Sequence, residues 1–193
     1  MRQVKSAEHL KSKLVPGQTY RRSDLAPFSS NVDKYLAQLV QDGELKKVAY
    51  GLYAVPRSTV FGEALPEERS LLQSFLKDDH FVVYSPSQFN LLGLGTTQLY
   101  NRVIVFNRKR VGEIELGSRS FYFHRWREAP KELSLEFLAV ECVNRLNELA
   151  EDREQIVVKM KEKLPQFDQR RLRHAILHYG NSSTQKKFFE LMK

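Results

Sequence analysis

TYRRSDLAPFSSNVDKYLAQLVQDGELKKVAYGLYAVP, residues 19–56, is the stretch of this 193-residue chain that decides the fold. Its central part is spaced for an amphipathic helix, because apolar side chains recur at i, i+3, i+4, i+7 and i+8. These side chains are Val32, Tyr35, Leu36, Leu39 and Val40. Asp33 suits the first helical turn, where the helix dipole favours negative charge, and Gly43 suits the left-handed residue that ends a helix. An amphipathic helix ending near Gln41 is therefore expected.

The opposite face of this helix is polar and carries only one full positive charge. Its residues are Ser30, Asn31, Lys34, Ala37, Gln38 and Gln41. Ser29, Ser30 or Asn31 can cap the helix, since a short polar side chain accepts a bond from an unpaired backbone N–H. Asparagine and glutamine can form two hydrogen bonds with an adenine edge, and serine can donate or accept. The face therefore has the chemistry of a surface that reads base edges.

A β-hairpin is expected directly after the helix. The apolar residues of its two strands are Leu45, Val48, Leu52 and Val55. Tyr50-Gly51 marks the turn between the strands. Lys46 and Lys47 lie close to that turn, where their charges can meet the phosphate backbone of a nucleic acid.

A short helix, a turn, a second helix and a hairpin, in this order, are typical of a winged helix-turn-helix, which puts one helix into the DNA major groove. The residues expected to contact DNA are Arg21, Arg22, Ser29, Ser30, Asn31, Lys34, Gln38, Lys46, Lys47 and Tyr50. The sequence thus predicts binding to double-stranded DNA. Many domains of this shape bind proteins instead, so a protein-interaction module that never meets DNA stays open as the alternative.

The charge of the chain favours an anionic partner. The formal net charge is +8 and the pI about 9.6. Residues 1–57 contain ten Lys or Arg and five Asp or Glu, so a charge of +5 lies in less than a third of the chain. Basic charge that is concentrated on a helix-turn-helix pattern supports nucleic-acid binding better than basic charge alone.

The remaining residues predict an α+β protein. We expect helices at 6–14, 67–77, 86–92, 153–163, 168–179 and 183–192, strands at 81–84, 102–107, 112–116 and 120–126, and a connector at 56–66. After Pro130 the chain is predicted to stay helical, with an apolar stripe of Leu135, Leu138, Cys142, Leu146 and Leu149. The expected domains are a winged helix-turn-helix in residues 1–57, a mixed α/β domain in 58–130 and a helical C-terminal region in 131–193 packed on it.

The aromatic run from Phe121 to Trp126 has two interpretations. Its rings could stack on nucleobases. Alternation along a strand explains them more simply, with Phe121 and Phe123 on one face and Tyr122, His124 and Trp126 on the other. Packing in the core is therefore the preferred prediction.

The lone cysteine, Cys142, excludes an internal disulfide and lies on an apolar helix face, so a buried thiol is expected. The first residues, MRQVKSAEHLKSKL, lack the apolar region of a secretory signal, and no run is long enough to span a bilayer. We therefore expect a cytoplasmic protein with no membrane partner.

Catalytic motifs are weak. Gly93-x-Gly95 lacks the third glycine of a dinucleotide fingerprint and follows a predicted helix rather than a strand. His174 and His178 have a spacing that can hold a metal, but Ala175 stands where a metalloprotease motif needs glutamate. We expect no enzyme activity, no cofactor and no metal site.

Residues 5–126 resemble the AbiEi-like antitoxins of type IV toxin–antitoxin, or abortive-infection, systems. The resemblance rests on YGLYAVP at 50–56, on glycine and proline at either end of 62–66, and on SPSQFNLLGLGTTQ at 85–98. In the last block Asn90, Leu91, Leu92, Gly93, Leu94, Thr97 and Gln98 match an element of that family. The family usually has a proline shortly after the glutamine, where this chain has Leu99-Tyr100.

This resemblance implies a transcriptional repressor that binds operator DNA through its N-terminal domain. It also implies a partner, a nucleotidyltransferase-like toxin, which the antitoxin opposes. Neither the toxin nor the antitoxin activity follows from the spacing or the composition of the chain.

Overall fold

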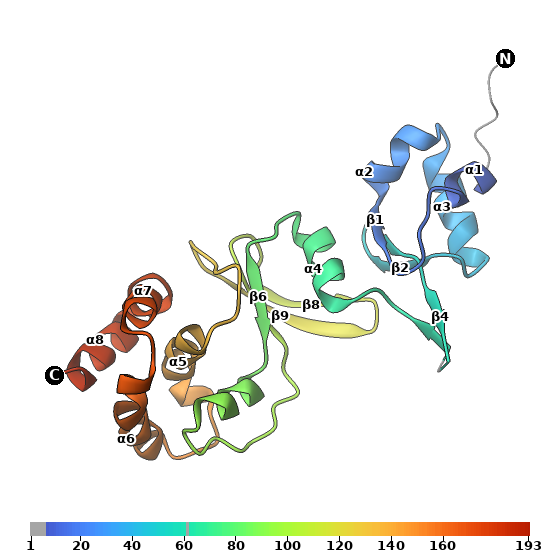
Figure 1. Ribbon diagram of the computed structural model, residues 1–193. Coiled ribbons are helices and arrows are strands. Elements are labelled where there is room, and N and C mark those ends of the chain that lie inside the picture. Colours follow the sequence, from blue (N-terminus) through green and yellow to red (C-terminus); the bar gives the residue numbers. More distant parts are fainter. Residues whose placement is uncertain (1–6, 61) are drawn as a thin grey trace. The chain divides into compact units, whose positions relative to one another are not determined.

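The computed structural model describes residues 7–60 and 62–193 and has the α+β architecture that the sequence predicts (Figure 1). Packing groups the residues into two units. The first unit holds the described residues up to Asp79 together with 114–120, and the second holds 80–113 and 121–193. Each unit is described by itself below.

The described part of the first unit contains four α-helices and a 3₁₀ turn around short strands. Its elements are α1 (Ala7–Lys11), β1 (Thr19–Arg21), α2 (Arg22–Leu25), η1 (Ala26–Phe28), α3 (Val32–Gln41), β2 (Lys46–Ala49), β3 (Leu52–Ala54), β4 (Arg57–Thr59), β5 (Gly62–Ala64) and α4 (Glu68–Leu76). Strands β1, β3 and β2 form one antiparallel sheet in that order. The predicted helix at 6–14 is shorter, and its expected start, Ser6, lies outside the described residues.

The apolar stripe of α3 builds the core of the first unit, as the sequence predicts. Val32, Leu36 and Leu39 are buried, and Tyr35 and Val40 pack against the same cluster. Gly43 has a φ of +78°, which glycine adopts without steric cost. The polar face of α3 is consequently turned away from this core.

Two features of the first unit differ from the expectation. Strand β1 was not predicted, because three residues are too few to show alternation. The expected connector at 56–66 is wrong, since β4 and β5 pair antiparallel with Arg57 opposite Ala64. These strands are mostly exposed and have no apolar face, so no hydrophobic pattern announces them.

The second unit packs helices on a mixed sheet. Its elements are β6 (Phe81–Tyr84), η2 (Pro86–Leu92), β7 (Ile104–Asn107), β8 (Gly112–Leu116, from Ile114 on grouped with the first unit), β9 (Arg119–Arg125), α5 (Leu135–Asn144), η3 (Leu146–Glu148), α6 (Arg153–Lys163), η4 (Leu164–Gln166), α7 (Gln169–Tyr179) and α8 (Ser182–Leu191). The strand order is β6-β7-β9-β8. β6 pairs antiparallel with β7, and β7 pairs parallel with β9.

Side-chain caps explain where the helices of this unit begin. The Ser85 hydroxyl accepts a bond from the backbone N–H of Ser87 and caps η2, the helix expected at 86–92. Asp152, Asp168 and Asn181 cap α6, α7 and α8 in the same way. Each cap satisfies backbone N–H groups that would otherwise lack a partner.

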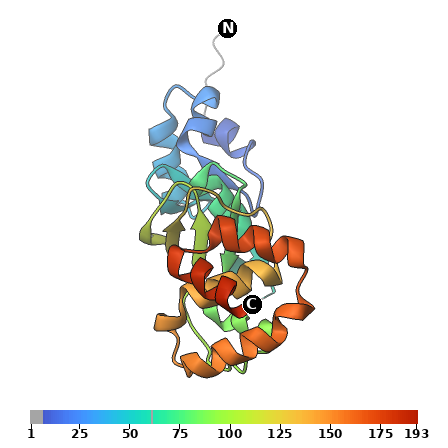
Figure 2. The same ribbon diagram turned by 90° about the vertical axis from the view of Figure 1, so that its left-hand side faces the viewer.

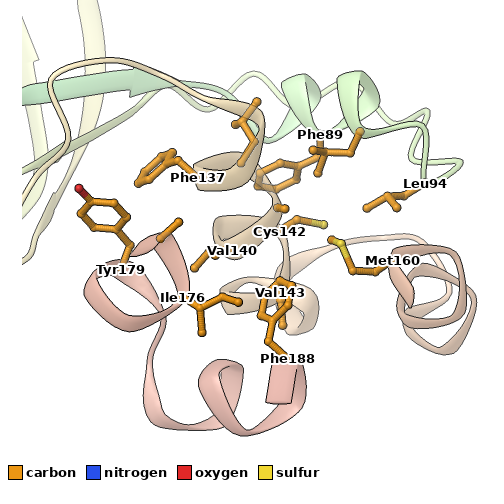
Figure 3. Close-up of a cluster of buried hydrophobic side chains, with 14 of the residues drawn as sticks. Phe89, Leu94, Phe137, Val140, Cys142, Val143, Met160, Ile176, Tyr179 and Phe188 are labelled. Atoms are coloured by element: carbon orange, nitrogen blue, oxygen red, sulfur yellow. The ribbon is translucent and has the colours of Figure 1, made fainter. Parts of the chain in front are cut away.

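Helix α5 is the centre of the second unit and contacts η2, α7 and α8 (Figures 1 and 2). Figure 3 shows Phe137, Val140 and Cys142 of α5 among side chains of the neighbouring elements. Of the predicted stripe, Leu138, Cys142, Leu146 and Leu149 are buried. Leu135 is 47% exposed, so its place in the stripe is wrong. Because neighbours cover α5 on several sides, Glu136 to Val143 are all buried and no single stripe describes the helix.

The packing divides the chain differently from the domains expected at 1–57, 58–130 and 131–193. Helix α4 contacts β1 and β3, so this part of the middle segment belongs to the first unit. Strands β6 and β7 share one hydrophobic core with α5 to α8, so the C-terminal helices complete the second unit rather than extend it. In residues 7–60 and 62–193, no helix combines the length and apolar character needed to cross a membrane.

Candidate nucleic-acid interface

The outward face of α3 is a polar surface open to solvent. Ser30, Asn31, Lys34 and Gln38 are exposed, as the sequence predicts, and Gln41 continues the row. Asn31 occupies the cap position of the helix, but its side chain makes no capping bond. The exposed amides of Asn31 and Gln38 therefore offer four N–H donors and two carbonyl oxygens on the side away from the core.

Ser29 does not belong to this surface. Its side chain is 4% exposed, and its hydroxyl accepts a 3.1 Å bond from the backbone N–H of Asn31. The sequence pattern could not separate Ser29 from Ser30, because either residue could begin the helix. Ser29 supports the start of α3 and is removed from the set of candidate contacts.

Arg22 is tied to α3. Its Nε and Nη2 donate to the two carboxylate oxygens of Asp33, both at 2.6 Å. The side chains are 48% and 69% exposed, so the pair lies in solvent. The hydrogen bond from Arg22 lowers the pKa of the Asp33 carboxyl and, reciprocally, raises that of the guanidinium. The backbone N–H of Arg22 also donates to the carbonyl of Gly51 at 2.9 Å, which fixes the hairpin turn against the start of α2.

The hairpin turn carries an aromatic ring that is almost fully exposed. Tyr50 is 98% exposed, and Lys47 Nζ lies 5.9 Å from the centre of its ring. Lys46 forms a 2.7 Å ion pair with Glu63 of β5 instead. Successive strand residues point to opposite faces, so the two lysines cannot serve the same surface. Lys47 and Tyr50 form one end of the candidate interface, and Lys46 is directed to β5.

Arg21 is a structural residue rather than a phosphate contact. Its guanidinium donates to the carbonyl oxygens of Ser74 and Phe75, at 2.7 and 2.5 Å. These carbonyls end α4, where the helix leaves its last C=O groups without intrahelical partners. Arg21 is half-buried as a result, and the prediction that it contacts phosphate is not supported by its position.

Sequence reasoning missed the second role of Asp33. Its place in the first turn was explained by the helix dipole, and the separation of 11 residues from Arg22 gave no local signal. The candidate interface is therefore the exposed face of α3 with Ser30, Asn31, Lys34 and Gln38, the ion pair Arg22–Asp33, and Lys47 with Tyr50 on the hairpin.

The second unit holds two groups that the sequence offers for other chemistry, Cys142 and the pair His174 and His178. Cys142 is fully buried, and burial raises the pKa of its thiol to about 12, so it is not poised as a nucleophile. The rings of His174 and His178 stack with centroids 4.1 Å apart, and His178 Nδ1 lies 2.6 Å from Glu128 Oε2. Of the part of the chain that the structure describes, these histidines join no group of three possible metal ligands.

Comparison with known proteins gives a likeness of fold. The crystal structure of the RV2827C protein from Mycobacterium tuberculosis is similar, with a TM-score of 0.57 and 16% sequence identity. The match covers 96% of this chain and 74% of that one. No protein-family model and no curated protein sequence matches the chain. At this identity the likeness concerns the fold alone, and the function is argued from the residues.

Proposed function

We propose that the first unit is a winged helix-turn-helix that binds double-stranded DNA, and that the protein is a transcriptional repressor acting as the antitoxin of a type IV toxin–antitoxin system. The observation that carries the DNA-binding part is the outward face of α3. It is solvent-exposed, rich in amides and hydroxyls, and flanked by an exposed lysine and tyrosine on the hairpin.

In the proposed complex α3 enters the major groove. Asn31 and Gln38 lie seven residues apart, which is about two helical turns or roughly 10 Å, and so can meet base edges about three base pairs apart along the groove. Lys34 on the same face and Lys47 on the hairpin contact phosphates, which set the position of the helix without reading sequence. Tyr50 adds a hydroxyl donor at the tip of the hairpin, where it can reach the sugar-phosphate backbone.

The Arg22–Asp33 pair has two effects on this interface. It ties α2 to the first turn of α3, and the bond from Arg22 N–H to Gly51 adds the hairpin turn. Helix and hairpin are thereby held in a fixed relation before DNA arrives, which lowers the ordering cost of binding. The pair also neutralises the one carboxylate that would otherwise face the phosphates from α3.

The antitoxin part of the proposal rests on the resemblance of residues 5–126 to the AbiEi-like family. It predicts a neighbouring gene for a nucleotidyltransferase-like toxin. Co-expression of the chain with that neighbour should restore growth that the neighbour alone arrests. Growth arrest that persists although the chain is present in folded form would contradict the antitoxin role. That result would not affect the proposal that the chain binds DNA.

A protein-interaction module without DNA binding is the second candidate, and one observation favours it. Arg21, Arg22 and Lys46 are all engaged within the first unit, so fewer cations are left for phosphates than the sequence suggested. This candidate predicts that repression and rescue survive when Lys34 and Lys47 are both changed to Gln. It also predicts a co-purifying protein partner.

The experiment that separates the two candidates is binding of the full chain to a fluorescent duplex from the region upstream of its own gene, at several salt concentrations. The proposal predicts that the logarithm of the affinity falls linearly with the logarithm of salt, by about 0.9 for each phosphate contact. Lys34→Gln with Lys47→Gln should reduce that slope by about 2. Arg153→Gln with Lys161→Gln, two exposed changes on α6 in the second unit, is the matched control.

A further inference from the structure

Cations gather at one edge of the sheet in the second unit. β7 and β9 are parallel neighbours with Asn107 opposite Arg125, so their carboxyl ends meet at the same edge. Arg108, Lys109 and Arg110 follow β7, and Arg125 and Arg127 lie at the end of β9. All five are exposed. The topology thus brings together two basic segments that are well separated in sequence.

A buried asparagine holds the basic loop in one conformation. Asn107 is 1% exposed, and its Oδ1 accepts from the backbone N–H groups of Lys109 and Arg110, at 2.8 and 2.7 Å. Its Nδ2 donates to the carbonyls of Arg110 and His124, at 3.1 and 3.3 Å. The same side chain therefore ties the loop after β7 to the end of β9, and the cations of both segments are carried on a rigid support.

A cavity of about 580 Å³ opens between these segments, and its lining residues are Arg108, Arg125, Trp126 and Arg127. The indole of Trp126 is held on two sides. Its Nε1 donates to the carbonyl of His178 at 2.7 Å, and its ring stacks on His124 with centroids 5.9 Å apart. The cavity therefore combines three guanidinium groups with one fixed aromatic ring.

The charge at this edge remains positive after the carboxylates are counted. The chain segments 105–113 and 122–128 contain five Lys or Arg and two Glu, Glu113 and Glu128. Asp78 and Asp79 come shortly before Phe81, which lies opposite Asn107 at the same edge, so five cations and four carboxylates sum to +1. Glu128 lies 2.6 Å from His178 Nδ1 and so is directed toward α7. The site is suited to an anion that extends beyond a single group.

We propose that this cavity binds single-stranded nucleic acid, with backbone phosphates on Arg108, Arg125 and Arg127 and one unpaired base against the indole of Trp126. Guanidinium groups match phosphate geometry with two parallel bonds. An aromatic ring among them favours an unpaired base, because a duplex hides the faces of its bases. The site is separate from α3 and does not depend on the proposed duplex binding.

Trp126 supplies a direct probe, since it is the only tryptophan of the chain. We would titrate the full chain with a twelve-nucleotide single strand, its duplex and an abasic strand of equal length, following tryptophan fluorescence. The proposal predicts quenching by the single strand, at least five-fold weaker quenching by the duplex, and none by the abasic strand. The quenching should persist in the Lys34→Gln, Lys47→Gln variant, which tests the proposed duplex interface separately.

Charge variants test the arginines. Arg108→Gln, Arg125→Gln and Arg127→Gln together should weaken binding of a labelled single strand more than ten-fold and lower the salt slope by about 2, at roughly 0.7 per lost contact. The matched control is Arg153→Gln, Lys161→Gln and Arg173→Gln, three exposed changes on α6 and α7, with an expected effect below three-fold. Trp126→Leu should weaken binding about ten-fold. Trp126→Phe keeps a ring and should recover most of the affinity, which separates stacking from folding.

Three results would overturn the inference. One is equal quenching by duplex and single strand. Another is equal weakening by the two triple variants. The third is unchanged single-strand affinity in Trp126→Leu, provided that the thermal transition shows that variant to be folded.

Discussion

Arg22 and Asp33 form a two-pronged ion pair on the surface of the first unit, with both nitrogen–oxygen distances at 2.6 Å. The pair joins α2 to the first turn of α3, at the edge of the face that we propose reads DNA. Both groups are exposed, so their pairing contributes little to stability. Its consequence for binding is larger, because Asp33 competes with phosphate for the same guanidinium.

Replacing Asp33 with Asn should therefore tighten duplex binding, because the gain of a phosphate contact outweighs the loss of the tie between α2 and α3. The backbone bond from Arg22 to Gly51 still holds the hairpin turn in this variant. The change removes a negative charge from the proposed interface and releases Arg22 for a phosphate. We expect a rise in affinity for specific and random duplexes alike, and a salt slope larger by about 0.9, the value of one added contact. Fluorescence anisotropy over a salt series measures both. A fall in affinity with unchanged stability would instead mean that the clamp between α2 and α3 matters more than the charge.

Arg21→Gln should destabilise the protein without changing how its DNA binding depends on salt. The guanidinium donates to the carbonyls of Ser74 and Phe75, and loss of two charge-assisted bonds costs about 1–3 kcal/mol. Urea unfolding gives the change in free energy, with Arg57→Gln as the exposed control. A salt slope that falls while stability holds would restore Arg21 to the set of phosphate contacts.

The second unit contains a buried charged network that should be sensitive to single changes. Arg145 is 5% exposed, and its Nε lies 3.0 Å from the Tyr84 hydroxyl and 3.1 Å from Glu141 Oε2. Burial raises the pKa of Tyr84 well above its usual value, and the adjacent Glu141 carboxylate adds to the effect.

Arg145→Leu would leave the Glu141 carboxylate in the core without its cation. The expected loss is about 3–5 kcal/mol of unfolding free energy, the cost of breaking a buried pair. Arg145→Leu combined with Glu141→Leu should recover part of this loss, because the uncompensated charge is gone. Equal stability of the single and double variants would show that packing, not charge, governs the site. Arg153→Gln, at an exposed position of α6, is the control. Its free energy of unfolding should stay within about 0.5 kcal/mol of that of the unchanged protein.

Stability should fall at alkaline pH because of Cys142. Burial raises the pKa of this thiol from 9.0 to about 12, so the folded state keeps the proton that the unfolded chain loses. The contribution of the protonated thiol to the free energy of unfolding is fully present below pH 9. It is lost between pH 9 and 12, at about 1.4 kcal/mol per pH unit. Urea titrations at pH 8, 9 and 10 measure it.

Cys142→Ala should flatten this pH dependence. A smaller loss of stability that begins near pH 10 should remain, because the pKa of Tyr84 is also raised by burial. In the native protein the thiol should also resist a disulfide reagent until unfolding exposes it. Rapid modification under native conditions, or the same alkaline slope in the Ala variant, would contradict the buried neutral thiol.

The sequence predicted those parts of the fold that repeat over several turns or carry a local cap. α3 was predicted by its five-residue stripe, and the helix expected at 86–92 is η2, which Ser85 caps. Strands β1, β4 and β5 were not predicted, because each has only three residues and β4 and β5 have no apolar face. Leu135 was misplaced because periodicity shows a stripe but not how many neighbours surround a helix.

The candidate site was predicted in outline and corrected in detail. The amphipathic pattern located Ser30, Asn31, Lys34 and Gln38 on the outer face of α3. It could not foresee that Arg21 reaches carbonyls more than 50 residues away, or that Lys46 pairs with Glu63. Such partners are brought together by tertiary packing and leave no trace in local spacing.

The most direct test of the account is the specificity ratio of Asn31→Ala and Gln38→Ala, the affinity for the upstream duplex divided by that for a random duplex. If α3 reads base edges, each change should lower this ratio by about 5- to 150-fold, which is about 1–3 kcal/mol at one base pair, while Lys47→Gln weakens both duplexes equally. A ratio that stays the same in the two α3 variants would contradict the claim that this face recognises DNA sequence.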